Sequence, residues 1–369
     1  MLYHLLVPLQ EYFSALNIFR YISFRSASAA MTAVLFSFIV GPWIIKKLHD
    51  RQIGETIRTN GPKTHDVKAG TPTMGGLIII GAILVPTLLF ARLDNIYIQM
   101  MIVSTIWMGI VGFIDDYLKA VKKSKKGLIA RYKLLGQVSL GLALGVVMML
   151  HPEFENLRTA TTFPFFKDLV IDLKAWWIYI PFVIFVVTAT SNSVNLTDGL
   201  DGLASGLLAI AALVFAGIAY VTGRADFSQY LNIIYLPSAG ELTVFCAALI
   251  GASMGFLWFN ARPAEVFMGD TGSLALGAAL GAVAVMLKKE FLLPFAAGVF
   301  ILESISVILQ VNYFRYTKRK YGEGRRLLRM APIHHHFELK GWDENKVVIR
   351  FWIIGIMFAL LTLTTFKIR

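Results

Sequence analysis

Two adjacent aspartates, Asp115 and Asp116, follow an apolar run from Ile98 to Ile114 and precede a basic segment from Lys119 to Lys133. A charge near hydrocarbon costs about 2.5 kcal/mol or more on membrane-insertion scales. A helix that ends at this point adds to the cost, because the C-terminus of a helix is partly negative and disfavours anions. The pair therefore predicts a positive partner, and a metal ion is the partner that we favour.

Three other segments are unusually polar for this chain: NSVNLTDGLDG at 192–202, NARPAEVFMGDTGS at 260–273 and PIHHHFE at 332–338. Their amides, carboxylates and imidazoles belong to Asn192, Asn195, Asp198, Asp201, Asn260, Glu265, Asp270, His334, His335 and His336. Oxygen ligands select a hard cation, and Mg²⁺ commonly takes one or two carboxylates together with phosphate oxygens and water. Such a site at a bilayer edge suits a reaction between a water-soluble phosphate compound and a lipid.

Each of these groups also has a structural interpretation. Asp198, Asp201 and Asp270 precede apolar helices and can act as N-caps. The glycines beside them can be turn or packing residues, or can leave backbone N–H groups open to phosphate. Successive histidines on a helix point about 100° apart, so the three cannot bind one ion together and a structural zinc site is not expected. Two of them can still reach an anionic substrate or transfer a proton, and a solvated interfacial cluster is the alternative.

Membrane helices must position these residues. The 369 residues are 56% hydrophobic and have a mean hydropathy of +0.64, whereas soluble domains are about 45–50% apolar. We therefore predict an all-α polytopic membrane protein with about ten transmembrane helices and a single domain, 1–369. The predicted spans are Ser26 to Ile45, Pro72 to Ala91, Ile98 to Ile114, Leu134 to Leu150, Ala175 to Ala189, Asp201 to Val221, Leu242 to Trp258, Thr271 to Leu287, Phe291 to Phe314 and Val347 to Phe366.

Basic residues concentrate in alternate loops, at 46–68, 119–133 and 315–346. The positive-inside rule makes that side cytoplasmic and both termini external. Span counting places all four polar groups on the same side, which predicts an active site at the cytoplasmic face. Residues 1–25 are predicted to form an interfacial helix ahead of a ten-span body, 26–369. The net charge of +12 is then mostly a signal of topology and of contact with anionic lipid, and no nucleic-acid partner is expected.

Four motifs in order along the chain carry a resemblance to a known family: GFIDDYLK at 112–119, NSVNLTDGLDGL at 192–203, FMGDTGS at 267–273 and PIHHHFE at 332–338. They resemble the polyprenyl-phosphate N-acetylhexosamine 1-phosphate transferases. Within that superfamily, PIHHHFE and the stretch KAGTPTMGG at 68–76 are similar to the phospho-N-acetylmuramoyl-pentapeptide transferase branch. The resemblance covers nearly the whole chain.

The resemblance implies transfer of phospho-N-acetylmuramoyl-pentapeptide from its UDP carrier to undecaprenyl phosphate, giving lipid I and UMP, in the bacterial cytoplasmic (inner) membrane. It implies Mg²⁺ as cofactor and a homodimer. The catalytic residues carried over are Asp115, Asp116, Asp270 and His334, with Asp270 and Asp115 as metal ligands. The implied substrate-binding residues are Lys68, Thr73, Lys133, Asn192, Asn195, Asp198, Leu200, Asp201, Asn260, Phe267, Gly269, His335 and His336. The superfamily often has an acidic or amide residue where this chain has Lys119, so Lys119 is not expected to bind metal.

Two alternatives and one mechanistic question stay open at this point. A sister transferase would take UDP-N-acetylglucosamine, and an ion-coupled transporter would place its carboxylates near the bilayer midplane. For a transferase, Asp115 or Asp116 can orient or deprotonate the lipid phosphate for direct attack, which we favour. An aspartate nucleophile would instead form a phosphoryl-enzyme and divide the transfer into two steps.

Overall fold

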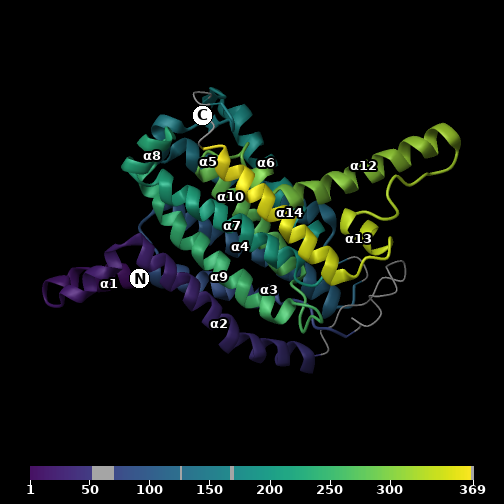
Figure 1. The fold of residues 1–369 in the computed structure, drawn as a ribbon, viewed down its shortest axis with the longest axis horizontal. Helices are drawn as coiled ribbons and strands as arrows, with labels where there is room; N and C mark the ends of the chain where they lie inside the picture. Colours follow the sequence, from purple (N-terminus) through teal and green to yellow (C-terminus); the bar gives the residue numbers. More distant parts are fainter. Residues whose placement is uncertain (52–69, 125–126, 167–169, 367–369) are drawn as a thin grey trace.

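In the part of the chain that the structure describes, ten long helices overlap the ten apolar runs of the sequence (Figure 1). The computed structural model describes residues 1–51, 70–124, 127–166 and 170–366. The ten helices are α2 (Ile22–Asp50), α3 (Gly76–Phe90), α4 (Ile96–Ala120), α5 (Ala130–Leu150), α6 (Trp176–Thr197), α7 (Leu203–Thr222), α9 (Leu242–Asn260), α10 (Gly269–Met286), α12 (Gly298–Tyr321) and α14 (Glu344–Thr364).

Shorter elements connect the long helices. The short α-helices are α1 (Leu2–Leu6), α8 (Ala225–Leu231), α11 (Leu293–Ala296) and α13 (Ile333–Glu338). Among the described residues, four 3₁₀ helices cover Pro8–Glu11, Ser14–Arg20, Pro152–Leu157 and Pro237–Glu241. The strands β1 (Ala160–Thr162) and β2 (Val170–Asp172) pair antiparallel, with Thr161 opposite Ile171.

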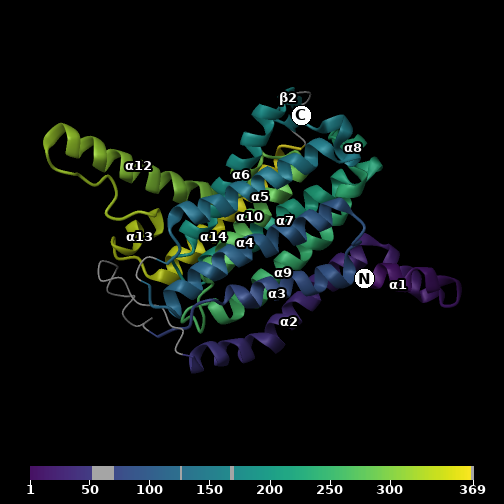
Figure 2. The same ribbon diagram turned by 180° about the vertical axis from the view of Figure 1, so that it is seen from behind.

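The prediction of an all-α polytopic membrane protein is confirmed. Within the described ranges, eight helical segments are long and apolar enough to cross a membrane. Of the other two, α3 is apolar but has 15 residues, and α12 has 24 residues and ends in a basic turn. The span predicted from Phe291 to Phe314 needs correction, because α11 is a separate short helix and α12 begins only at Gly298. From there α12 leaves the bundle obliquely and projects beyond it (Figures 1 and 2).

The N-terminal segment also differs from its prediction. Instead of one interfacial helix over 1–25, the structure has α1, two 3₁₀ helices and then the start of α2 at Ile22. Pro8 begins the first 3₁₀ helix, and proline cannot donate the backbone bond that would continue α1. The segment extends away from the bundle beside the start of α2 (Figure 1). The amino group of Met1 donates to the carbonyl of Leu88 near the end of α3.

Short polar residues set the ends of the helices that matter for the site. Asn95 caps α4, its side chain accepting from the N–H groups of Tyr97 at 2.9 Å and Ile98 at 3.4 Å. Asp343 caps α14 in the same way. Gly322 ends α12 with a positive φ of 78°, a conformation that glycine adopts without steric penalty.

Helix α10 lies at the centre of the bundle and packs against α3, α4, α6 and α7. Two glycines allow unusually close approach to its N-terminal turn. A β-carbon at Gly112 of α4 would lie 2.2 Å from the carbonyl oxygen of Asp270, and one at Gly76 of α3 would lie 2.1 Å from the backbone nitrogen of Gly272. Real β-carbons essentially never approach so closely. The absence of side chains at these two positions therefore brings the ends of α3 and α4 onto the start of α10.

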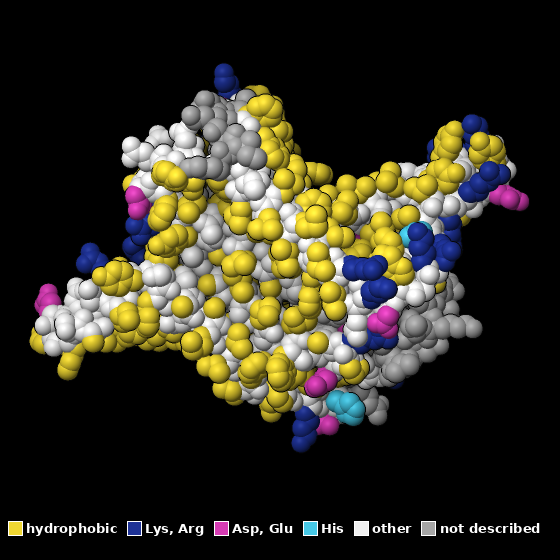
Figure 3. Space-filling view, in the orientation of Figure 1, with side chains coloured by type: hydrophobic (Ala, Val, Ile, Leu, Met, Phe, Trp, Pro, Cys, Tyr) yellow, Lys and Arg dark blue, Asp and Glu magenta, His cyan; other side chains and the backbone are white. Residues whose placement is uncertain are grey.

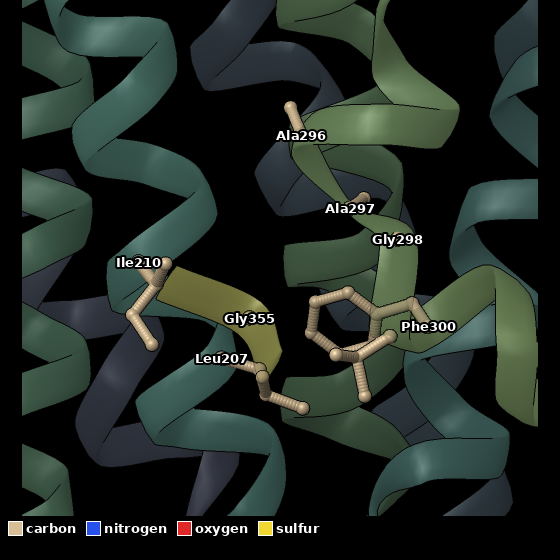
Figure 4. A pocket seen from close by; sticks show the side chains of 8 residues that line it. Leu207, Ile210, Ala296, Ala297, Gly298, Phe300 and Gly355 are labelled. Carbon is tan, nitrogen blue, oxygen red and sulfur yellow. The ribbon is translucent and has the colours of Figure 1, made fainter. Parts of the chain in front are cut away.

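The bundle interior is tightly packed and its surface is apolar. A cavity of about 10 Å³ lies among apolar side chains of α7, α11 and α12 next to Gly355 (Figure 4), which is about the room that one water molecule needs. In the middle of the face in Figure 3, yellow hydrophobic side chains alternate with white atoms and no charged side chain is seen, whereas lysines and arginines lie toward its edges. Such a surface suits helices surrounded by lipid.

A buried ion pair fastens the end of the bundle opposite Asp115 and Asp116. Arg25 of α2 donates from both terminal nitrogens to the carboxylate of Glu241, each at 2.7 Å, and to the carbonyl of Phe90 at 3.2 Å. Arg25 and Glu241 are 1% and 5% exposed. Because each charge has a close, well-aligned partner, the pair ties α2 to α9 and to the end of α3.

We predict that Glu241→Ala destabilises the fold by about 3–5 kcal/mol, because it leaves the Arg25 charge buried without its partner. The double variant Arg25→Met/Glu241→Leu should lose much less stability, because it removes both charges together and leaves neither buried without a partner. Thermal unfolding of the detergent-solubilised variants measures both effects. Arg224→Ala, which breaks an exposed ion pair with Asp226, should leave the Tm unchanged. Equal losses from the single and double variants would contradict the assignment.

Candidate active site

The carboxylate of Asp116, near the end of α4, caps the start of α10. It accepts hydrogen bonds from the N–H of Asp270 at 3.1 Å, the N–H of Thr271 at 2.8 Å and the hydroxyl of Thr271 at 2.6 Å. The first N–H groups of a helix lack intrahelical partners and carry partial positive charge. Asp116 thus finds a positive partner in the α10 N-terminus.

Asp115 and Asp270 face two lysines. Asp115 is fully buried, and its carboxylate forms ion pairs with Lys119 and, at 2.9 Å, with Lys133. The carboxylate of Asp270 accepts from Lys119 at 3.2 Å and from Lys133. Asp115 also accepts from the N–H of Leu128 at 2.6 Å, which closes the α4–α5 loop over the carboxylate. The cluster therefore joins the end of α4, the first turn of α5 and the start of α10.

Helix α6 adds an amide to this cluster. The side chain of Asn195 donates to Asp270 at 2.9 Å and to the Ser273 hydroxyl at 2.8 Å. On the opposite side, Thr73 lies beside Gly269, where a β-carbon would be 3.1 Å from the threonine hydroxyl. Backbone hydrogen bonds between 72–76 and 267–268 hold that strand-like segment in place.

The three aspartates supply a donor set that fits a hard divalent cation. Carboxylate oxygens of Asp115, Asp116 and Asp270 lie within 4.8 Å of one another. Three negative charges face the two ammonium groups of Lys119 and Lys133, so the ionised cluster keeps a net charge of −1 before any cation binds. All candidate ligands are oxygens, as Mg²⁺ requires. The three donors to Asp116 all belong to the first turn of α10. Asp115 and Asp270 are held mainly by the side chains of Lys119 and Lys133, which can turn away, so these two aspartates are the better placed ligands.

A second polar group lies where the α6–α7 loop meets the α9–α10 loop. Asn260 is buried, accepts from the N–H of Gly202 at 3.0 Å and donates to the carbonyl of Val266 at 2.9 Å. Asp201 accepts from the N–H of Ala264 at 3.3 Å, and its own N–H donates to Glu344 at 3.0 Å. Asn260 and Asp201 therefore hold the two loops together and join them to α14.

The structure places the remaining loop residues around these two groups. Asp198 ends α6 and Leu200 is buried in the turn that follows. Phe267 is half-buried on the segment that pairs with residues 72–76. Asn192 is exposed and donates to Gln137 of α5 at 3.0 Å. Lys68, which the sequence predicts to bind substrate, lies outside the described residues.

The N-cap interpretation of three aspartates is wrong. Helix α7 has Gly202 at its N-cap and no side-chain cap, so neither Asp198 nor Asp201 caps it. Helix α10 has Met268 at its N-cap, and the Asp270 carboxylate bonds Asn195 and the two lysines instead. The carboxylates of Asp201 and Asp270 are instead engaged in contacts between segments.

The three histidines of α13 have different surroundings. His334 is fully buried, with Nδ1 3.1 Å from a carboxylate oxygen of Glu303, and its other ring nitrogen packs on Gly199. His335 lies 2.7 Å from Glu338. His336 accepts from the N–H of Arg329 at 3.0 Å, and burial together with the charges of Lys340 and Arg329 lowers the pKa of its imidazole.

The sequence interpretation missed three residues of this region. Lys119, which the sequence interpretation considered only as a position that is not a metal ligand, forms ion pairs with two of the aspartates. Its position four residues after Asp115 is the spacing of a helical ion pair. Thr271 supplies two of the three donors to Asp116. Glu303 is fully buried within a predicted span, where an ionisable residue signals a function by default.

Comparison with known proteins agrees with this geometry. The model of glycosyl transferase family 4 matches residues 98–288, and signature 1 of phospho-N-acetylmuramoyl-pentapeptide-transferase matches residues 68–80. Proteins of that name from Gemmatimonas aurantiaca, Chloroherpeton thalassium and Thermodesulfovibrio yellowstonii are 54%, 52% and 50% identical to this chain. Each alignment covers 100% of both proteins. The chain belongs to the phospho-N-acetylmuramoyl-pentapeptide transferase family.

Proposed function

We propose that the protein transfers phospho-N-acetylmuramoyl-pentapeptide from UDP-N-acetylmuramoyl-pentapeptide to undecaprenyl phosphate, forming lipid I and UMP in peptidoglycan synthesis. The observation that carries the proposal is the cluster of Asp115, Asp116 and Asp270 with Lys119 and Lys133. It lies at one end of a membrane bundle whose full-length relatives bear this transferase name. One domain, 1–369, would carry the whole reaction.

The two lysines suit the electrostatics of phosphoryl transfer. Catalysis of this reaction depends on positioning the phosphates and on stabilising charge on the transferring group and the leaving oxygen. Lys119 and Lys133 each contact two carboxylates, so their ammonium groups are already oriented toward the centre of the cluster. On substrate binding they would bind phosphate oxygens of the donor.

Mg²⁺ is the proposed cofactor, held by Asp115 and Asp270. When bound, it would neutralise negative charge on the phosphates of the donor. Asn195 would keep the Asp270 carboxylate oriented through its 2.9 Å hydrogen bond. Thr73 and Gly269 border the cluster on its α3 side, and we assign them to substrate binding.

For the chemical step we favour direct attack of the lipid phosphate on the phosphorus linked to the sugar, with UMP leaving. Asp115 is a better candidate than Asp116 for orienting or deprotonating the lipid phosphate. The Asp116 oxygens accept three hydrogen bonds from the first turn of α10, which hold them in place. The Asp115 carboxylate is instead held mainly by two lysine side chains, which can turn toward a substrate phosphate. Trapping a kinetically competent phospho-aspartate would overturn direct attack.

The nucleoside would bind between the two loops that Asn260 and Asp201 hold together. Phe267 is half-buried beside this junction and offers a ring for stacking on uracil. Leu200 and Asp201 would lie close to the base. We assign Asn192, Asp198, His335, His336 and Lys68 to contacts with the rest of the donor, on the strength of the family match.

The acceptor needs an apolar surface for its isoprenoid chain. A groove of about 430 Å³ lies between α12, α13 and α14, and its walls are almost entirely apolar. Ile333 and Phe337 of α13 line this groove, while His334 between them packs on the α6–α7 loop. A chain in the groove would thus have its phosphate end next to the histidines.

The site would face the cytoplasm of a bacterium from the inner membrane. Lys119 and Lys133 of the basic segment 119–133 lie at the site, and the positive-inside rule assigns basic loops to the cytoplasmic side. A homodimer is proposed from the family alone. A transporter is disfavoured because the carboxylates gather at the ends of helices, where Asp116 of α4 accepts a hydrogen bond from α10. The names of the relatives argue against the sister transferase that would take UDP-N-acetylglucosamine.

The decisive assay measures UMP release from UDP-N-acetylmuramoyl-pentapeptide by the purified protein. We expect release only when Mg²⁺ and a polyprenyl phosphate are both present, because the carboxylates need a cation and the transfer needs an acceptor. UDP-N-acetylglucosamine serves as the matched donor control and should give no UMP. Release from the control donor alone would favour the sister transferase, and solute flux without UMP would favour a transporter.

Asp270→Asn should reduce UMP release by about 100-fold or more, because the variant removes a charged ligand from the centre of the cluster. Folding should survive, since an amide can keep the hydrogen bond with Asn195. Initial rates and the Tm of both proteins check the two statements. Wild-type turnover by the variant would refute the assignment of Asp270 as a metal ligand.

Asp116→Asn should lower both the Tm and the UMP rate, because an amide cannot accept all three hydrogen bonds from α10. Thr271→Val is the matched probe, since it removes one of these donors and leaves every carboxylate in place. We expect Thr271→Val to cost about 1 kcal/mol of stability and to slow turnover to a lesser degree. A fully active Thr271→Val beside an inactive Asp116→Asn would instead indicate that Asp116 reacts chemically.

A further inference from the structure

Helix α12 presents three polar side chains at intervals of seven residues: Glu303, Gln310 and Thr317. Seven residues make almost two turns of an α-helix, so the three lie on one face. Glu303 and Thr317 are buried and Gln310 is partly buried, although most residues around Gln310 and Thr317 on this projecting helix are exposed. These three residues form a polar stripe along α12, and the stripe faces protein and not lipid.

The chain returns along this stripe after α12 ends. The hydroxyl of Thr317 accepts from the N–H of Arg325 at 2.8 Å. The side chain of Gln310 accepts from the N–H groups of Leu327 at 3.1 Å and Leu328 at 2.8 Å, and donates to the Leu328 carbonyl at 3.2 Å. These bonds guide residues 325–332 back toward the bundle, so that α13 begins beside Glu303.

The third member of the stripe contacts a histidine. Nδ1 of His334 lies 3.1 Å from a carboxylate oxygen of Glu303, and both side chains are fully buried. An ionised carboxylate only accepts protons, so it favours the imidazole form with its proton on Nδ1. The opposite nitrogen, Nε2, is turned toward the α6–α7 loop, where a β-carbon at Gly199 would lie 2.5 Å from it.

Neither ring nitrogen of His334 forms a hydrogen bond with a residue that the structure describes, but only Nδ1 lies at ion-pair distance from a carboxylate. A buried polar atom without a partner is costly, at about 1–3 kcal/mol. Gly199, against which Nε2 packs, belongs to the segment Asp198 to Asp201, which is part of the loop that we assign to the donor substrate. Nδ1 thus faces the Glu303 carboxylate, and Nε2 faces this loop, where a partner that arrives with the substrate would satisfy it.

We propose that Glu303 is a positioning residue: it fixes the orientation and the Nδ1 proton of His334, so that Nε2 is presented to the bound substrate. The hydrogen bonds of Gln310 and Thr317 to the return segment place His334 beside Glu303. The inference rests on the proposed transferase function and adds to it a residue of α12 that touches no substrate. Carboxylates that orient an imidazole in this way commonly influence activity through the second ring nitrogen.

A double-mutant cycle for UMP release tests the proposal. We expect Glu303→Ala to lower kcat by about 10–100-fold in a protein that has His334. In a protein that already carries His334→Ala, the Glu303→Ala substitution should lower kcat by less than about twofold, because the effects of residues that act as a unit are not additive. Glu303→Gln keeps an acceptor oxygen at the same place and should retain more activity than Glu303→Ala. Losses that multiply independently in the cycle would reduce Glu303 to a structural role and overturn the proposal.

A matched pair of amides on α12 tests the stripe. Gln310→Leu should lower kcat, because it removes three hydrogen bonds that guide the return segment. Asn312→Leu changes an exposed amide two residues away and should leave kcat unchanged. Equal effects of the two substitutions would contradict a guiding role for Gln310.

A spectroscopic readout separates this proposal from the proposed reaction. In ¹⁵N-histidine NMR of the full-length protein, assigned with His334→Ala, His334 should carry its proton on Nδ1, and Glu303→Ala should change that signal. A proton on Nε2 in the wild-type protein would overturn the proposal even if UMP is released. If the wild-type protein releases no UMP, the proposed reaction fails, while the ¹⁵N signal still decides whether Glu303 controls the imidazole.

Discussion

The contact between the Asp116 carboxylate and the first turn of α10 is the interaction on which the rest of the site depends. It joins two helix ends of opposite partial charge through one side chain, at distances of 2.6–3.1 Å. The contact also brings Asp270 to face Asp115 across the two lysines. Without this bond, the C-terminus of α4 and the anionic side chains near it would repel one another.

The positive partner that the sequence predicts for the aspartate pair is in fact divided. Asp116 is stabilised by peptide dipoles, while Asp115 is stabilised by the ammonium groups of Lys119 and Lys133. The metal ion that we propose would then serve catalysis and would not be required for the fold. The two adjacent carboxylates consequently have different environments, which gives a physical reason for assigning them different tasks.

The sequence predicted the membrane helices and the gathering of polar loops well, because hydropathy runs and loop charge are local properties. It also identified Asp270 and Asn195, through motifs, as partners of the aspartate pair. It could not reveal the role of Asn260 as a tie between two loops, since that depends on a partner 58 residues away, Gly202. The break before α12 and the burial of Glu303 were also missed. An apolar run with one acidic residue predicts a single continuous span, because hydropathy alone does not show which side chains contact other helices.

The close packing at Gly112 and Gly76 has a consequence for motion. With backbone atoms of α3 and α4 already touching the first turn of α10, these helix ends can neither slide past nor tilt against one another without a clash. The three aspartates therefore move as one rigid body. An opening that admits a large donor and a lipid is therefore expected on the other side, where α12 and α13 contact α6 and α14 and are joined by residues 322–332.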